Sequence, residues 1–198
     1  MTLWDSLRSI LEVIELFEEL KVPYHIGGSF AGSVHGVPRQ TNDLDVVAAL
    51  PSIVAPILEL RLRDRFYVDA DMIRRAVRDQ SSFNLVHLAT GFKIDVFVAG
   101  DREFDRMELR RAIEHRVDEL NRSLMVKSPE DTLLRKLEWY RLGGEVSDRQ
   151  WNDLLGIVRT QRTRLDREYL WHWASVLEVQ DLLHRLLDSA GPESGREV

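Results

Sequence analysis

The chain has 198 residues, a net charge of −6 and no cysteine. This length can bury a full core, as one domain or as a domain with a helical annex, while the acidic balance argues against a general attraction to nucleic acid. The lack of cysteine excludes disulfides, thiolate metal sites and a cysteine nucleophile, and it is typical of a cytoplasmic protein.

The first predicted element is an amphipathic helix over residues 3 to 20, in which apolar side chains recur at helical spacing. Pro23 ends it, because proline has no N–H group for a further helical hydrogen bond. Acidic residues interrupt the apolar pattern, so this helix is not expected to be a signal peptide. No apolar run approaches the ~20 residues that span a bilayer, and no membrane partner is expected.

A short strand over residues 24 to 26 comes next, and Gly27 and Gly28 end it. Ser29 then opens a helix that ends near Gly36. Glycines allow a tight turn and leave backbone N–H groups open to a ligand. The helix N-terminus adds unpaired donors and the positive end of a dipole, so this turn is a candidate site for a phosphate group.

Two residues near the end of this helix, His35 and Arg39, carry side chains that could bind a ligand or hold the loop. Arg39 is suited to bind a phosphate through two parallel hydrogen bonds, or to pair with a nearby carboxylate and hold the loop. His35 is expected to be structural, with a hydrogen bond to the loop before Asp43. A metal role for His35 is not expected, because the candidate ligands beside it are hard oxygen atoms.

The second strand begins at Asp43. Asp43 and Asp45 are two residues apart, so on a strand both carboxylates face the same side. Two carboxylates beside a phosphate turn form a site for Mg²⁺ carrying a nucleoside triphosphate. The same spacing recurs at Asp69 and Asp71, where Asp71 is expected to cap a helix over residues 72 to 79. The alternative for the first motif is a structural turn followed by two solvated aspartates.

A helix over residues 52 to 62, interrupted by Pro56, precedes a predicted hairpin. The strands of the hairpin are residues 83 to 88 and 92 to 98, joined through a Thr-Gly turn. On the second strand Lys93, Asp95 and Phe97 share one face, opposite an apolar face. An aspartate is costly to bury in such a strand unless it is paired or binds a metal. Asp95 is therefore the candidate third carboxylate, and the alternative is a strand-edge aspartate in solvent.

The remaining elements are mostly helical: a helix over 103 to 111, strands over 116 to 120 and 122 to 126, and helices over 128 to 142, 148 to 158, 167 to 177 and 179 to 189, followed by a tail over 191 to 198. Ser128 and Asp148 are the expected caps of the first two C-terminal helices. Tryptophans are expected to fill the core of this helical region: Trp139, Trp151, Trp171 and Trp173. The most basic stretch is either a solvated face or a contact for RNA phosphates: Arg159, Arg162, Arg164 and Arg167.

The order Gly-Gly-Ser, helix, Asp-x-Asp and later strand aspartate resembles the core motif of nucleotidyltransferases of the DNA polymerase β-like superfamily. The closest likeness is to bacterial nucleotidyltransferases of the abortive-infection, type IV toxin–antitoxin kind. The resemblance is specific over residues 24 to 48, fair around 93 to 97 and loose over 127 to 155. It implies an α/β (α+β) fold, in which a small mixed β-sheet flanked by helices forms a core domain over residues 1 to 127, with a helical C-terminal subdomain over 128 to 190.

The resemblance also implies a lysine that reaches the triphosphate and a later aspartate. Lys136 matches the first and Asp153 the second, with Asp148 as the competing match. From the residues alone, Lys136 would be an ordinary surface lysine. The expected nucleotide-binding residues are Gly27, Gly28, Ser29, Arg39, Lys136 and Asp153, and the expected catalytic and metal-binding residues are Asp43, Asp45 and Asp95.

These expectations describe an enzyme that moves a nucleoside monophosphate from a nucleoside triphosphate to an acceptor hydroxyl and releases pyrophosphate. The expected cofactor is Mg²⁺ or Mn²⁺. The expected acceptor is tRNA or a protein, and a toxin–antitoxin role with an antitoxin partner fits the resemblance. Two other functions stay open from the sequence: a non-catalytic nucleotide-binding regulator and an antibiotic-modifying nucleotidyltransferase.

Overall fold

The computed structural model describes residues 3–38, 41 and 43–191. Arg39 and residues 192–198 of the predicted tail lie outside the described residues. The chain divides into two compact units, the first made of residues 1–30 and 40–127 and the second of residues 31–39 and 128–198. The division also breaks after residue 127, and it groups residues 31–39, which the prediction assigned to the core domain, with the C-terminal helices.

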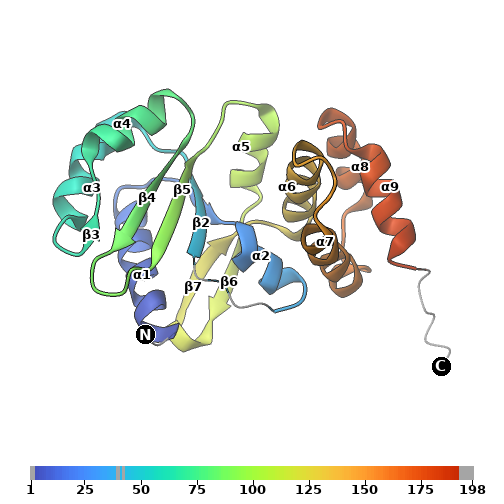
Figure 1. Ribbon diagram of the computed structural model, residues 1–198, viewed down its shortest axis with the longest axis horizontal. Coiled ribbons are helices and arrows are strands. Elements are labelled where there is room, and N and C mark those ends of the chain that lie inside the picture. The colour runs from blue at the N-terminus through green and yellow to red at the C-terminus, as the bar shows by residue number, and fades with distance from the viewer. Residues whose placement is uncertain (1–2, 39–40, 42, 192–198) are drawn as a thin grey trace. The chain divides into compact units, whose positions relative to one another are not determined.

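The first unit is built on a mixed β-sheet (Figure 1). Its described strands are β1 Tyr24–Ile26, β2 Asp43–Ala48, β3 Phe66–Tyr67, β4 Ser82–His87, β5 Lys93–Val98, β6 Ile113–Val117 and β7 Arg122–Val126. They lie in the order β3-β4-β5-β2-β1-β7-β6. β2 is parallel to β5 and β1 is parallel to β7, whereas the other neighbours are antiparallel. The predicted mixed sheet and the hairpin of β4 and β5 are confirmed.

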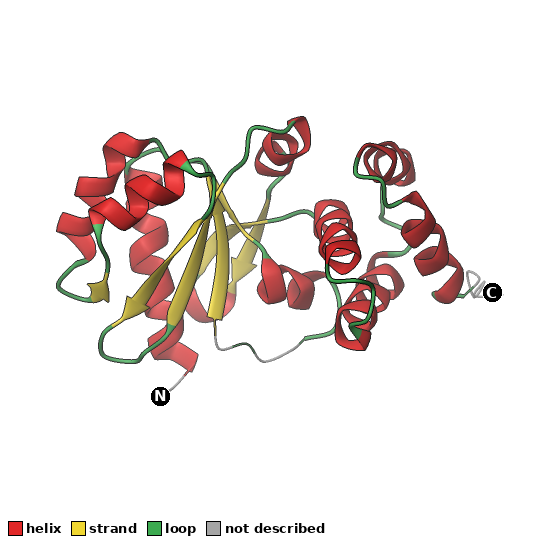
Figure 2. Ribbon diagram, turned by 45° about the horizontal axis from the view of Figure 1, so that its top comes forward, coloured by secondary structure: helices red, strands yellow, loops and turns green. Residues whose placement is uncertain are grey.

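One face of this sheet carries the core of the first unit (Figure 2). The helices that pack on it are α1 Leu3–Glu19, α3 Ala55–Leu62 and α4 Ala70–Arg78, with a 3-10 turn at Ser52–Val54 before α3. Leu44 and Val46 of β2 and Ile94 and Val96 of β5 are buried there. Burial of each such side chain stabilises the fold by about 1.5–3 kcal/mol. Since strand residues alternate between faces, Asp43, Asp45 and Asp95 lie on the opposite face.

Two further helices follow strands of this sheet. α2, Gly28–His35, begins directly after β1. α5, Glu103–Arg110, lies on the other side of the sheet from α3 and α4 (Figure 2). Phe104 of α5 is buried, which anchors the helix. The predicted helices over residues 3–20, 29–36 and 103–111 are therefore present, each displaced by no more than one residue at either end.

Two predicted helix caps are wrong by one or two residues. Asp69, not Asp71, caps α4: its carboxylate accepts a hydrogen bond from the Met72 N–H at 2.6 Å. Likewise Ser147, not Asp148, caps the helix that begins at Asp148. In both cases the capping residue has an extended backbone, which is the conformation that a capping side chain needs.

The strand predicted over residues 116–120 is also misplaced. β6 spans Ile113–Val117, and a 3-10 turn follows at Asp118–Leu120. Asn121 has a left-handed backbone with φ 48°, a conformation that asparagine tolerates better than most residues. This tight turn joins β6 to β7, so the polar residues before Val117, rather than the residues after it, form the strand.

The second unit is helical, and its C-terminal helices are α6 Pro129–Leu142, α7 Asp148–Gln161, α8 Arg167–Val176 and α9 Gln180–Ser189. Ser128 caps α6 as predicted, with its hydroxyl accepting from the Asp131 N–H. Aliphatic side chains fill the interior: Leu133, Leu134, Leu137, Leu154, Ile157, Leu170, Leu182, Leu183 and Leu186. None of the helices among the described residues is long and apolar enough to cross a membrane.

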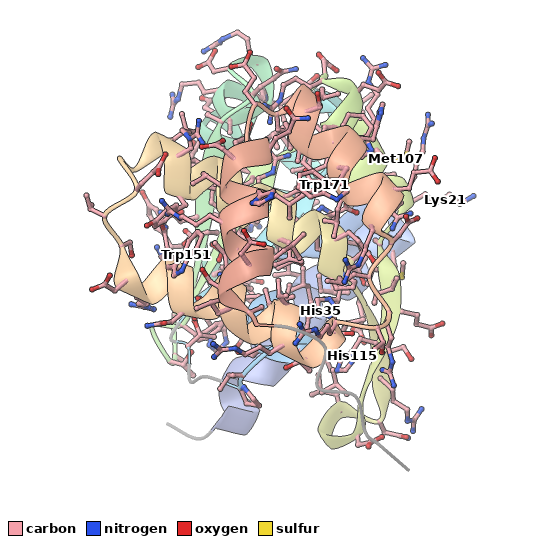
Figure 3. All side chains as sticks on the ribbon, turned by 90° about the vertical axis from the view of Figure 1, so that its right-hand side faces the viewer. Lys21, His35, Met107, His115, Trp151 and Trp171 are labelled. Atoms are coloured by element: carbon pink, nitrogen blue, oxygen red, sulfur yellow. The ribbon has the colours of Figure 1, made fainter. Side chains whose placement is uncertain are left out.

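The tryptophans of the second unit were predicted to fill its core, which is correct only for Trp173. Trp139 and Trp171 are 56% and 36% exposed, and Figure 3 shows Trp171 on the face turned to the viewer. Trp151 is half-buried, and the Arg185 guanidinium lies 4.3 Å from the centre of its ring. Leucine and isoleucine fill most of the interior with Trp173, whereas the indole rings of Trp139 and Trp171 lie at the surface.

Candidate active site

The glycine turn is held against β2 in the first unit. The Gly27 N–H donates to the Asp45 carbonyl oxygen at 2.9 Å, and Gly28 has a left-handed φ of +53°. A Cβ atom at Gly28 would overlap the Asp45 carboxylate. Both the backbone conformation and the space therefore require glycine here. The turn lies against the Asp45 side chain at the start of α2, and its role as a phosphate site stays a prediction.

The strand register places five residues in one row across the sheet. Asp45 of β2 lies beside Asp95 of β5, and Asp95 lies opposite Asn84 of β4. On the other side, Gly27 follows β1 next to Asp45, and Lys127 follows β7 next to Gly27. Neighbours in register point to the same face of a sheet. Asp45 and Asp95 therefore share one face, although 50 positions separate them in the sequence.

Asp43 lies on the same face, two residues before Asp45, and its partner across to β5 is Lys93. The Thr41 hydroxyl donates to Oδ1 of Asp43 at 2.8 Å. The Lys93 ammonium lies 2.8 Å from Oδ2 of Asp95, whose side chain is 14% exposed. The structure thus places all three predicted carboxylates on one face of two adjacent strands, each beside a hydrogen-bonding or charged neighbour.

Asp45 is the electrostatic centre of this group. Its burial raises its pKa above the usual value, and the negative charges of Asp43 and Asp95 raise the pKa further. The positive charges of Lys93 and Lys127 act in the opposite direction. A half-buried carboxylate with two acidic neighbours is therefore short of positive charge, which is the condition that a divalent cation relieves.

The donor set suits Mg²⁺ or Mn²⁺, because it consists of hard carboxylate oxygens. Among the described residues, however, no group of three or more His, Asp or Glu side chains stands close enough to hold a metal ion. Asp95 is paired with Lys93, and Asp43 accepts a hydrogen bond from the Thr41 hydroxyl.

Asp45→Asn is expected to stabilise the metal-free protein at neutral pH by about 1 kcal/mol, the usual scale of a stabilising substitution. A carboxyl group whose pKa is raised on folding costs stability when ionised, and this cost disappears as the pH falls below the pKa of the unfolded state. Urea unfolding in chelator, at neutral and at acidic pH, measures the difference between variant and wild type.

The extra stability of Asp45→Asn over wild type should be present at neutral pH and shrink as the pH falls. Asp71→Asn is the matched control, because Asp71 belongs to the other Asp-x-Asp pair and is exposed. It should change stability by no more than about 0.5 kcal/mol. If wild type is at least as stable as Asp45→Asn at neutral pH, the ionised Asp45 carboxylate does not lower the free energy of unfolding.

Lys127 is a site residue that the sequence analysis missed. Its side chain is 5% exposed, and its ammonium lies 2.5 Å from Oε1 of Glu108 on α5. Its Cε atom lies 3.6 Å from the position that a Cβ at Gly27 would occupy. The sequence presents Lys127 only as the residue before a helix cap. Its role became visible through the pairing of β1 with β7, which no local pattern reveals.

The remaining predicted nucleotide-binding residues belong mostly to the second unit. Lys136 pairs with Asp153 at 3.1 Å, and both side chains are largely buried. The Cε atom of Lys136 lies 3.3 Å from the Cβ position at Gly32 in α2. Asp153, rather than its competitor Asp148, is therefore the partner of Lys136. Ser29 is half-buried in the first turn of α2.

His35 is buried at the end of α2 in the second unit, as expected for a structural residue (Figure 3). Its backbone carbonyl accepts a hydrogen bond from the side chain of Gln161 at 3.0 Å. The loop before Asp43, to which a hydrogen bond from His35 is predicted, includes residues 39, 40 and 42, which lie outside the described residues. His35 therefore helps to fix the end of α2 against α7.

The fold is that of the nucleotidyltransferases, as predicted. Among solved structures, an antigenic nucleotidyltransferase-like protein from Paracoccidioides brasiliensis is similar over 93% of each chain, with 16% identity and a TM-score of 0.55. The antibiotic-resistance factor ANT(2'')-Ia is 16% identical over 89% of this chain and 92% of its own, with a TM-score of 0.49.

The lincosamide antibiotic adenylyltransferase LnuA, in its lincomycin-bound structure, is 17% identical over 77% of this chain and 94% of its own, with a TM-score of 0.45. No family model and no curated protein matches the chain. At these identities, the similarity to the Paracoccidioides protein defines the fold and leaves the substrate to be argued from the site.

Proposed function

We propose that this chain is a Mg²⁺-dependent nucleotidyltransferase, which moves a nucleoside monophosphate from a nucleoside triphosphate to an acceptor hydroxyl. The observation that carries the proposal is the register of Asp45 beside Asp95, with the Gly27–Gly28 turn packed on Asp45. A phosphate-binding turn and three carboxylates on one face are the parts that phosphoryl transfer requires. The nucleotidyltransferase fold supports the same conclusion.

Each part has a distinct role. The backbone N–H groups at Gly28 and Ser29 orient the β- and γ-phosphates at the N-terminus of α2. Asp43 and Asp45 hold the metal ion that accompanies the triphosphate, and Asp95 serves the acceptor side. When bound there, Mg²⁺ or Mn²⁺ supplies Lewis-acid neutralisation of the phosphate charge. Positioning and charge neutralisation then account for most of the lowering of the barrier.

The bond changes are those of a displacement at phosphorus. The acceptor oxygen attacks the α-phosphorus, the bond from the α-phosphorus to the bridging oxygen breaks, and pyrophosphate leaves. Asp95 receives the proton of the acceptor hydroxyl, because it is the carboxylate of the group that is furthest along the sheet from the glycine turn.

Lys136 and Asp153 are proposed to serve the triphosphate as well. This part of the proposal rests on the resemblance of the sequence, and within the second unit Lys136 lies against Gly32. Its ion pair with Asp153 limits the directions that the ammonium group can take. A contact of Arg39 with the triphosphate stays a prediction from the sequence.

The first test is nucleotide binding with and without a divalent cation. We expect the protein to bind a nucleoside triphosphate in Mg²⁺ and to lose this binding in excess chelator, because three carboxylates repel bare phosphate. Calorimetry measures both conditions, and Asp71→Asn is the control for loss of a remote aspartate. Equal affinity in chelator and in Mg²⁺ would contradict the proposed metal role.

The predicted residues that could contact the acceptor are fewer than those that could bind the triphosphate. Of the predicted basic stretch, Arg162 donates to the carbonyl oxygens of Ala190 and Gly191, so it contributes to the fold. Arg159, Arg164 and Arg167 are exposed to solvent. A tRNA or protein acceptor, a toxin–antitoxin role and a cytoplasmic location therefore stay predictions.

Label transfer from each radioactive nucleoside triphosphate distinguishes the candidate functions. The protein is incubated with Mg²⁺ and, separately, with tRNA, cell extract, or aminoglycoside and lincosamide antibiotics. Labelled RNA, labelled protein or labelled antibiotic identifies the acceptor class. Metal-dependent nucleotide binding without transfer to any acceptor or release of pyrophosphate would instead favour the non-catalytic regulator.

A further inference from the structure

Lys93 opens β5 on the same face as Asp95, two residues further along. Its ammonium lies 2.8 Å from Oδ2 of Asp95, and its backbone partner on β2 is Asp43. The Asp95 side chain is 14% exposed, whereas that of Lys93 is 42% exposed. An exposed cation thus occupies one oxygen of a largely buried carboxylate at the proposed metal site.

The charge of Lys93 acts on the whole carboxylate group. Its hydrogen bond to Asp95 raises the pKa of Lys93, burial lowers this pKa, and the charges of Asp95, Asp43 and Asp45 raise it again. The positive charge of Lys93 in turn lowers the pKa of Asp45. Lys93 therefore compensates, in part, the same negative charge that a divalent cation would compensate.

The other lysine near Asp45 differs in one important respect. Lys127 is buried and its ammonium group is paired with the buried Glu108. Moving this ammonium group away would leave a buried carboxylate without its partner, at a large cost in free energy. Lys93 has a solvent-exposed, flexible stem and a surface ion pair, which is the kind that breaks readily. Of these two lysines, Lys93 is therefore the one whose ammonium group a metal ion can displace from its carboxylate.

We propose that Lys93 is a resident counter-cation of Asp95, which a divalent metal ion must displace and which weakens metal binding before the nucleotide arrives. One carboxylate oxygen cannot accept an ammonium group at hydrogen-bond distance and a Mg²⁺ ion at about 2.1 Å without a large repulsion between the two cations. The ion that Asp95 would help to hold, on the acceptor side, then binds after the triphosphate, whose charge stabilises the displaced ammonium group. This inference rests on the proposed metal role of Asp43, Asp45 and Asp95.

Mn²⁺ binding to the nucleotide-free protein tests the inference without any measurement of activity. Electron paramagnetic resonance of free Mn²⁺ is followed for wild type, Lys93→Met, Lys93→Arg and Arg74→Met. Lys93→Met is expected to bind Mn²⁺ about tenfold more tightly, because one repelling charge near the ion is removed. Lys93→Arg keeps the charge and should stay within about threefold of wild type.

Arg74→Met is the matched control, since Arg74 is another exposed cation paired with an aspartate, at 2.5 Å from Asp71, and it belongs to α4. It should leave Mn²⁺ affinity unchanged. The gain from Lys93→Met should also fall below about twofold when Asp95→Asn is present, because the two residues act on the same interaction. Thermal unfolding of each variant confirms that it is folded.

Equal or weaker Mn²⁺ binding by Lys93→Met overturns the inference. If Asp45→Asn loses Mn²⁺ binding while Lys93→Met matches wild type, the metal site stands and only the role of Lys93 is wrong. If Asp45→Asn binds Mn²⁺ as well as wild type does, the ion is not at these carboxylates, and the proposed function fails together with the inference.

Discussion

Asp45→Asn is expected to abolish nucleotidyl transfer, with a fall in kcat of about 1,000-fold or more. Asp45 is the carboxylate that contacts the glycine turn and lies in register with Asp95, so it lies between the proposed phosphate site and the proposed acceptor side. The amide keeps the shape that packs on Gly28 but removes the charge that is proposed to hold the metal ion. Affinity for Mg²⁺–triphosphate should fall as well, which calorimetry measures on the same sample.

The stability of this variant provides an internal control. Asp45→Asn is expected to unfold at a higher denaturant concentration than wild type in chelator, because the pKa of Asp45 is raised by burial and by its acidic neighbours. Loss of transfer in a more stable protein excludes misfolding as the cause. Asp71→Asn, in the other Asp-x-Asp pair, should transfer at the wild-type rate. Turnover by Asp45→Asn within tenfold of wild type would remove Asp45 from the mechanism.

Asp95→Asn is expected to separate nucleotide binding from transfer. Asp95 is proposed to act on the attacking hydroxyl, so its role begins only when the acceptor arrives. Binding of Mg²⁺–triphosphate should therefore stay within a few-fold of wild type. Transfer should fall by at least ~100-fold, the order expected for loss of a positioned base or of a charge-stabilising group. Calorimetry and single-turnover label transfer on one preparation measure both quantities.

The alternative for Asp95 is a solvent-facing strand aspartate, which predicts almost no change in either quantity. Its 14% exposed side chain and its register beside Asp45 argue for the functional role. Asp79→Asn offers a control for an exposed aspartate in the same unit, because Asp79 pairs only locally with Arg78 at the end of α4. If Asp95→Asn turns over normally, the enzyme assignment rests on Asp43 and Asp45 alone.

The predictions that succeeded rest on local rules. Apolar spacing predicts α1, the two-residue period predicts the faces of β2 and β5, and consecutive glycines predict the turn before α2. The cap of α6 at Ser128 also follows from a local pattern. The caps at Asp69 and Ser147 were missed because two polar residues compete within a short segment, and only the backbone conformation decides between them.

Other features depend on burial in three dimensions. Trp139 and Trp171 are apolar enough to suggest a core, yet the second unit places them at its surface. The pair of Lys127 with Glu108 joins a residue after β7 to a residue on α5, and neither side chain stands out in the sequence. Their partnership follows from the position of β7 beside β1, which brings Lys127 next to Gly27.

The sequence by itself determined the parts of the candidate site: a glycine turn at a helix start, two carboxylates on one strand face and a third on a later strand. Such features depend on dihedral preference and on the period of a strand, which act over a few residues. The tertiary structure alone decided that Asp95 lies beside Asp45 and that Lys93 and Lys127 supply the nearby positive charge. Strand order and register are set by the whole core, because a shift by one residue would turn every apolar side chain of a strand to the wrong face.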